Sequence, residues 1–244
     1  MTNSIDEINY KDSRIKVTYD HSSSLTGRSK CFGNVNFLTM KKSERRHIKS
    51  KYKNGKIIEL DIKSLEPRVM CKINNLKLAD DIYTYIASNI IFSEKKRKDV
   101  KLGILAIIYG ANFKTVSKLS GLSQSESIKI KSYLKVDELN RKLKRQYEIN
   151  NHIKNYYNRP IFSKDNSALV NHYIQSTAAD CAQLAFYNYL KNIDHSKFNL
   201  IAVIHDAVIL DVHPDMCENI IATPYIYESR LDIKLPLKSE VINE

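Results

Sequence analysis

The spacing of apolar residues changes along the chain, from runs typical of strands to spacings typical of helices. The run Lys56–Ile62 is rich in β-branched residues and predicts a buried strand, which we expect Pro67 to end or to place at an edge. Two further apolar runs, Leu200–Ile204 and Val208–Val212, lie on either side of His205-Asp206-Ala207. They predict a strand-turn-strand hairpin.

Between these strand segments the pattern is helical. We expect one helix over residues 94–109 and a second that begins at Ser123 and continues to about Tyr147, because Ser123 and Glu126 have the spacing of a capping box. A third helix is expected from about Asn171 to Lys191. One face of this third helix would carry Ile174, Ala178, Cys181, Ala185 and Tyr189.

Together these signals predict an α+β fold, in which a small antiparallel sheet is divided in sequence by a helical insertion. There is no repeat of fixed period and no linker rich in Pro, Gly or Ser, so we treat the chain as one folded unit. Its 244 residues are enough to bury a core without disulfides or structural metals.

The charge balance indicates an acidic partner. Lys and Arg number 39 against 27 Asp and Glu, which gives a net charge of +12 and favours nucleic acid as a partner. The six glycines form neither a G-x-G-x-x-G fingerprint nor a P-loop, so any phosphate would be held by side chains.

The four cysteines, Cys31, Cys71, Cys181 and Cys217, occur singly and match no zinc motif, so we expect them to be reduced packing residues. The N-terminus does not resemble a signal peptide, and the longest apolar stretch, near residues 102–111, is far shorter than a bilayer span. We therefore expect a cytoplasmic protein without a membrane partner.

Two carboxylates are candidates for a metal site. Asp61 lies at the end of a predicted strand and Asp206 lies in the predicted hairpin turn, 145 residues later (206 − 61). Two carboxylates about 4 Å apart would repel by roughly 4 kcal/mol at an effective dielectric constant of 20, so both stay ionised only with a cation between them. Mg²⁺ suits such oxygen ligands. The alternative is structural: Asp206 supports the turn and Asp61 caps the strand end.

A basic segment opens the first predicted helix, since five of the eight residues 94–101 are Lys or Arg. Cations at a helix N-terminus cost roughly 0.3–1 kcal/mol each unless an anion binds there. Arg97 and Lys101 could hold a polyphosphate, while Tyr109, further along the same stripe, offers a ring to a base. The alternative is a solvated basic face.

Six segments together are similar to motifs of the family A, DNA polymerase I-like, polymerases, in the same order and over most of the chain. The segments are Thr26-Gly27-Arg28, Asp61-Ile-Lys-Ser-Leu-Glu66-Pro-Arg68, Asp81-Ile-Tyr83-Thr-Tyr-Ile-Ala87, Arg97-x₃-Lys101-x₃-Leu105-x₃-Tyr109-Gly110, Asn171-x₃-Gln175-Ser-Thr-Ala-Ala-Asp180 and His205-Asp206-Ala207.

The resemblance implies a right-hand polymerase palm with inserted helical fingers. The palm would cover about residues 20–75 and 165–244 and the fingers about 76–164, in one catalytic domain of residues 1–244. It also implies a template-directed DNA polymerase that adds deoxynucleotides to a primer 3′-hydroxyl by two-metal phosphoryl transfer. The partners would be primer-template DNA and deoxynucleoside triphosphates (dNTPs).

The resemblance also implies a role for each matching residue. Asp61, the Ile62 carbonyl and Asp206 would bind two Mg²⁺ ions, with Mn²⁺ as an alternative ion. Arg97 and Lys101 would grip the triphosphate, and Lys101 would protonate the departing pyrophosphate. The remaining contacts would come from Glu66, Leu105 and Tyr109 beside the sugar, Tyr83 near the pyrophosphate, and Arg28, Asn171, Gln175 and His205 on the DNA.

The sequence departs from the family pattern at several positions. Ala207 replaces an acidic residue, Tyr83 a histidine, Leu105 an aromatic residue and Ser176 a glycine. Only 25 residues precede Thr26, so we expect a polymerase without a thumb or an exonuclease, of the kind a phage or plasmid would encode. Such an enzyme would act distributively, or a separate polypeptide would supply the missing contacts to the DNA duplex.

Two alternative functions stay open at this point. A polymerase-like protein that has lost catalysis would bind primer-template DNA as a structural or regulatory subunit. Residues 113–129 also fit a helix-turn-helix with Gly121 in the turn, which is typical of a DNA-binding regulator.

Overall fold

The computed structural model describes residues 9–10, 13–20 and 24–243. The chain divides into two compact units, one formed by residues 1–63 and 179–244 and the other by residues 64–178. The assignment of palm and fingers to parts of the chain stays a prediction.

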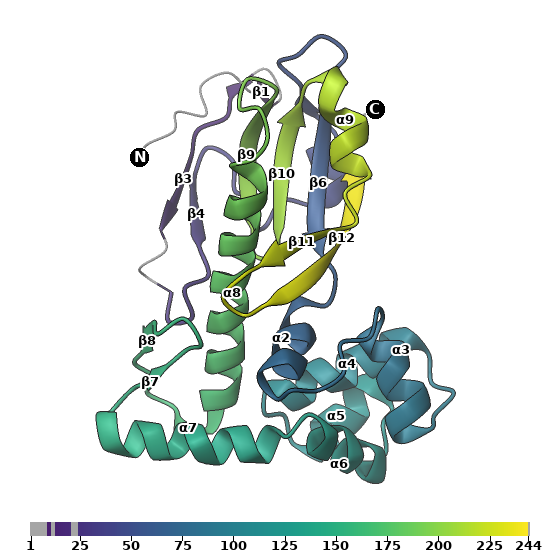
Figure 1. The fold of residues 1–244 in the computed structure, drawn as a ribbon, viewed down its shortest axis with the longest axis vertical. Coiled ribbons are helices and arrows are strands. Elements are labelled where there is room, and N and C mark those ends of the chain that lie inside the picture. Colours follow the sequence, from purple (N-terminus) through teal and green to yellow (C-terminus); the bar gives the residue numbers. More distant parts are fainter. Residues whose placement is uncertain (1–8, 11–12, 21–23, 244) are drawn as a thin grey trace. The chain divides into compact units, whose positions relative to one another are not determined.

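The first unit is built on a five-stranded antiparallel sheet (Figure 1). Its strand order is β11-β12-β6-β10-β9. The bounds are β6 Lys56–Ile62, β9 Phe198–Ile204, β10 Ala207–Val212, β11 Tyr225–Glu228 and β12 Ile233–Val241. Because β6 lies in the sheet between strands from the end of the chain, the sheet is divided in sequence, and the predicted α+β fold is confirmed.

Smaller elements complete the first unit. Strand β1 lies between β2 and β5 in a three-stranded sheet, and β3 pairs with β4. The bounds are β1 Asn9–Tyr10, β2 Ser13–Arg14, β3 Val17–Asp20, β4 Lys30–Gly33, α1 Lys42–Arg45, β5 Ile48–Lys49 and α9 Pro214–Ile221. None of these short elements was predicted from the sequence.

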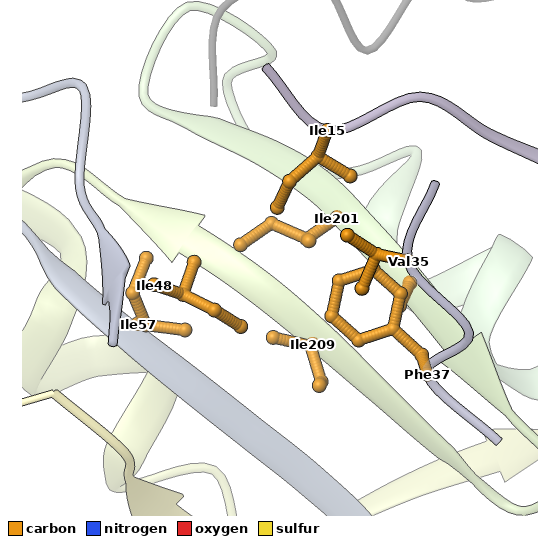
Figure 2. Packing of buried hydrophobic residues seen from close by; sticks show 8 residues of the cluster. Ile15, Val35, Phe37, Ile48, Ile57, Ile201 and Ile209 are labelled. Carbon is orange, nitrogen blue, oxygen red and sulfur yellow. The ribbon is translucent and has the colours of Figure 1, made fainter. Parts of the chain in front are cut away.

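A buried apolar cluster packs against the central strands of the first unit (Figure 2). Ile57 from β6, Ile201 from β9 and Ile209 from β10 are fully buried in it, and Phe37, which lies outside the regular elements, covers them. Burial of such side chains stabilises the unit by roughly 1.5–3 kcal/mol each. The cluster holds together strands that are far apart in sequence.

The second unit contains helices and one small hairpin (Figure 1). Its bounds are α2 Leu65–Ile73, α3 Ile82–Ile86, η1 Ala87–Ile91, α4 Arg97–Ile108, α5 Phe113–Ser120, α6 Gln124–Tyr133, α7 Val136–Asn150, β7 Ile153–Lys154, β8 Pro160–Ile161 and η2 Asn166–Ala168. The long helix α8, Leu169–Leu190, begins in this unit and continues into the first.

The helix expected over 123–147 is two helices. The capping box is confirmed, since the Glu126 amide donates to Ser123 Oγ (3.1 Å) and the Ser123 amide to Glu126 Oε2 (2.7 Å). However, α6 ends at Tyr133, because Lys135 adopts a left-handed conformation with a φ of 52° that ends one helix before the next begins.

Two other predicted features have a different position in the structure. The basic helix begins at Arg97, with Lys96 as its N-cap, so Glu94 and Lys95 precede it. Pro67 follows β6 as expected but lies in the first turn of helix α2, where its missing N–H breaks no helical hydrogen bond. The third predicted helix is confirmed as α8.

The cysteine prediction is confirmed, because all four are free and buried. Among the described residues, no helix is long and apolar enough to cross a membrane.

Candidate active site

Strand pairing brings Asp61 and Asp206 together in the first unit. Ala207, the first residue of β10, pairs with Asp61 of β6, and the Ile62 amide donates a hydrogen bond to the Asp206 carbonyl (2.9 Å). The turn before β10 is tight, since His205 has a φ of 52°. The predicted hairpin is thus confirmed, and its turn places Asp206 beside the end of β6.

The surroundings of Asp61 disfavour its ionised form. Burial, followed by the negative charges of Asp206 and Glu59, raises the pKa of the Asp61 carboxyl to about 6, and the opposing effect of Lys42 and Lys238 is smaller. A carboxyl that ionises with difficulty in the free protein gains from a cation placed beside it.

Glu59, which the sequence analysis missed, is a third carboxylate on this face of β6. It lies two residues before Asp61, so the two side chains point to the same side of the strand. Glu59 is buried and forms ion pairs with Arg45 Nη1 (2.5 Å) and Lys42 Nζ (3.2 Å). These cations compensate its charge, so Glu59 does not replace the acidic residue expected at Ala207.

The oxygen atoms at this site fit a hard divalent cation. Asp61 and Asp206 supply two carboxylates, and Ile62 adds a main-chain carbonyl at the end of the same strand. Within the part of the chain that the structure describes, no group of three or more His, Cys, Asp or Glu residues could hold a metal ion. Carboxylate and carbonyl oxygens are the donors that Mg²⁺ prefers, and this ion commonly keeps water and substrate phosphates among its ligands.

Arg28 and His205 also come close together in the first unit. Gly27, with a φ of 72°, forms a turn before Arg28, and its amide donates to the Ser24 carbonyl (3.0 Å). Burial lowers the pKa of His205, and the charge of Arg28 lowers it further, whereas Asp206 opposes this shift. His205 is thus held neutral beside a cation and a carboxylate.

In the second unit, Arg97 at the start of α4 contacts two residues of the preceding helix. Its Nε donates to Asp81 Oδ2 (2.5 Å), and its guanidinium lies over the Tyr83 ring, 5.0 Å from the centroid. Asp81 also caps helix α3 by accepting from the Tyr83 amide (3.1 Å). The sequence alone does not identify Asp81 as the partner of Arg97.

The remaining predicted residues of α4 follow Arg97 along the helix. Lys101 is exposed, Leu105 is half-buried and Tyr109 is 38% exposed. The Tyr109 hydroxyl donates a hydrogen bond to Glu66 Oε2, which joins two residues predicted to lie beside the sugar. Gly110, with a φ of 79°, follows Tyr109 and provides the left-handed conformation that ends the helix.

Asn171 and Gln175 lie one turn apart on α8, as predicted, and both are half-buried. The Oδ1 atom of Asn171 is buried, and among the described residues it has no hydrogen-bond partner. A buried amide oxygen without a donor is costly, which favours a ligand or a water molecule at this position.

The fold is similar to that of a solved structure, the POL domain of Pol1 from M. smegmatis in complex with DNA primer-template and dNTP. The TM-score is 0.72 at 16% sequence identity, and the match covers 94% of this chain. The chain spans about half the length of that one, 47%. No curated protein shows significant similarity to the chain.

The family model described as DNA polymerase family A matches residues 1–242. This match extends over nearly the whole sequence and includes all six motif segments, so the chain belongs to DNA polymerase family A.

Proposed function

We propose that the protein is a template-directed DNA polymerase that adds deoxynucleotides to a primer 3′-hydroxyl. The observation that carries the proposal is the pair Asp61 and Asp206, which β6 and β10 bring together from positions 145 residues apart and which are close enough for the charge of Asp206 to raise the pKa of Asp61. Membership of DNA polymerase family A supports the same reaction.

Asp61, Asp206 and the Ile62 carbonyl would hold two Mg²⁺ ions. When bound, these ions would supply charge neutralisation on the triphosphate and a lower pKa for the primer 3′-hydroxyl. The two aspartates would act by position, because their carboxylates attract cations to the end of the central sheet. Mn²⁺ is the alternative ion, since it prefers the same oxygen ligands.

Arg97 and Lys101 would bind the triphosphate at the start of α4. Asp81 and Tyr83 contact the Arg97 guanidinium and orient it. An incoming phosphate would compete with Asp81 for this group. Lys101 is exposed one turn further along the helix, where it would donate a proton to the departing pyrophosphate. Tyr83 would contact the same leaving group.

Glu66 and Tyr109 would exclude ribonucleotides. Their hydrogen bond fixes a carboxylate beside an aromatic ring, and a ribose 2′-hydroxyl placed there would clash or leave the carboxylate poorly solvated. Leu105 would line the same space. This arrangement favours deoxynucleotides as substrates.

The DNA contacts would be insensitive to sequence. Asn171 and Gln175 would reach the minor groove, where acceptors lie in similar places for every base pair, and Arg28 and His205 would contact the primer terminus.

The buried Ala207 favours a second candidate function. It pairs with Asp61, where the family pattern has an acidic residue, so one carboxylate is missing beside the proposed ions. The second candidate is a protein that binds primer-template DNA without catalysis.

The test is single-nucleotide incorporation on a primed DNA template with Mg²⁺. The wild-type protein should extend the primer, whereas Asp61→Asn and Asp206→Asn should each lose at least about 100-fold in rate, because several kcal/mol of charge stabilisation is removed. Asp215→Asn is the matched control, since this exposed aspartate lies in the same unit and should leave the rate unchanged.

The outcome distinguishes the two candidates. A wild-type protein that binds primer-template DNA but incorporates no nucleotide with Mg²⁺ or Mn²⁺ would overturn the polymerase proposal and support the second candidate. Supplying ribonucleotides to Glu66→Ala separately tests the exclusion of ribose.

A further inference from the structure

The second unit has a groove along helix α7 that the proposed reaction does not use. Its volume is about 600 Å³, and helix α7 contributes most of its lining. The lining residues are Ile73, Asn74, Leu139, Lys142, Leu143, Arg145, Gln146, Ile149, Asn150, Lys154 and Tyr173.

The spacing along α7 makes this surface one continuous helix face. Leu139, Leu143, Gln146 and Asn150 recur every three or four residues, which places them on the same side of the helix. Leu139 and Leu143 are buried, whereas Ile149 is 69% exposed. The lined stretch of α7 is about 16 Å long, from a rise of ~1.5 Å per residue.

The groove is strongly cationic. Lys142 and Arg145 from α7 and Lys154 from β7 are exposed along it. In the described ranges of the chain, neither Asp nor Glu lines the groove, and the acidic residues of α7 lie outside the lining. A potential of one sign in a concave surface attracts an extended anion.

The rest of the lining suits nucleobases better than a bare anion. Ile149 and Tyr173 offer apolar and aromatic surface, and Asn150 offers an amide near the cations. Proteins that bind single strands without sequence preference combine a basic groove for the phosphates with such surfaces for the bases. Phosphate or an isolated acidic side chain would use only the cations.

We propose that this groove binds a segment of single-stranded nucleic acid, with phosphates at Lys142, Arg145 and Lys154 and bases against Ile149 and Tyr173. The site is separate from the residues of the proposed reaction, and binding requires neither metal nor nucleotide. In a polymerase it would hold unpaired strand outside the catalytic residues.

Helix α7 itself provides a matched control for the test. Arg141 and Lys144 are also exposed on α7, but they do not line the groove. The double variants Lys142→Ala/Arg145→Ala and Arg141→Ala/Lys144→Ala each remove one Lys and one Arg from the same helix. They therefore differ in position but not in charge or composition.

The experiment measures binding of a fluorescent single-stranded oligonucleotide by the full chain, with EDTA present, over a range of salt concentrations. Removing two phosphate contacts should make the slope of log K against log salt shallower by about 1.4, from ~0.7 for each contact on a single strand. The control double variant should keep the wild-type slope and affinity. Lys154→Ala should reduce the slope by about 0.7, and the exposed Lys164 provides its control, Lys164→Ala.

Equal changes in the two double variants would overturn the proposal, because binding would then follow the general charge of α7. A poly-glutamate peptide that binds as tightly as the oligonucleotide and shows the same dependence on Lys142 and Arg145 would also overturn it, in favour of an acidic protein partner. The same measurement on Asp61→Asn should match the wild type. Loss of primer extension together with intact binding therefore affects only the proposed function.

Discussion

The two units bring their candidate functional residues together in different ways. In the first, Asp61 and Asp206 meet only because β6 pairs with β10, although they are 145 residues apart. In the second, Arg97 and Lys101 are neighbours because they lie one turn apart on α4. The carboxylate pair thus depends on the whole sheet, whereas the basic helix depends on local structure.

The units also differ in the electrostatic surroundings of their candidate residues. Burial and like charges raise the pKa of Asp61 to about 6, so the ionised form of this carboxyl is disfavoured in the free protein. Arg97, in contrast, already has a partner in Asp81. The candidate carboxylate of the sheet unit is therefore disfavoured in its ionised form, whereas the candidate cation of the helical unit is stabilised by an ion pair.

The largest expected effect comes from damage to the core of the sheet unit. Ile209→Ala removes a fully buried side chain from β10 and leaves a cavity in the cluster of Figure 2. It should lower the free energy of unfolding by about 2–5 kcal/mol, measured by urea denaturation. The exposed Ile128 of α6 gives the control: Ile128→Ala should change stability by less than about 0.5 kcal/mol. Equal losses would contradict the assignment of this cluster as the core.

A smaller effect is expected from the local structure of the helical unit. Ser123→Ala removes the capping box of α6 and should cost about 1 kcal/mol in thermal or urea unfolding. Ser125→Ala makes the same substitution at an exposed position inside the helix, where alanine is the better helix former. If both variants had the same stability, the capping interaction would contribute nothing.

The smallest effect depends on pH. Partial burial acts to raise the pKa of Asp81, but hydrogen bonds from Arg97 and Thr84 outweigh it and lower the pKa below its ordinary value of 3.8. Ionised Asp81 therefore stabilises the fold above about pH 4, and this contribution is lost as the pH falls through the lowered pKa. Because the pair is partly exposed, Asp81→Asn should cost less than about 1 kcal/mol at pH 7. The cost should shrink in urea titrations as the pH falls below about 4. A cost that stays constant as the pH falls would exclude the ion pair as its cause.

The sequence predicted elements whose signals are local and strong. β6, the hairpin of β9 and β10, helix α8 and the capping box at Ser123 all follow from apolar spacing or from a short motif. The break at Lys135 was missed because a lysine gives no sign that it adopts a left-handed conformation. Strand β12 was missed because it contains Pro236, which usually excludes an inner strand.

In the candidate sites, too, the sequence predicted only what local motifs reveal. The motifs located Asp61 and Asp206, and the strand register then explains how two distant carboxylates meet. The pairing of Glu59 with Arg45, and of Arg97 with Asp81, depends on tertiary packing, which one sequence does not reveal. The alternation of side chains along β6 could have indicated Glu59, since Glu59 shares a face with Asp61.

The most direct test separates the contribution of each unit to nucleotide incorporation. Rapid-quench measurements of a single addition, with the dNTP concentration varied, give a maximum rate and a half-saturating concentration for each variant. Asp206→Asn should reduce the maximum rate by about 100-fold or more, since it removes charge stabilisation in the transition state. Arg97→Ala should mainly raise the half-saturating concentration, by roughly 10-fold or more, because it removes a charged contact to the triphosphate. A normal maximum rate in Asp206→Asn would contradict the account.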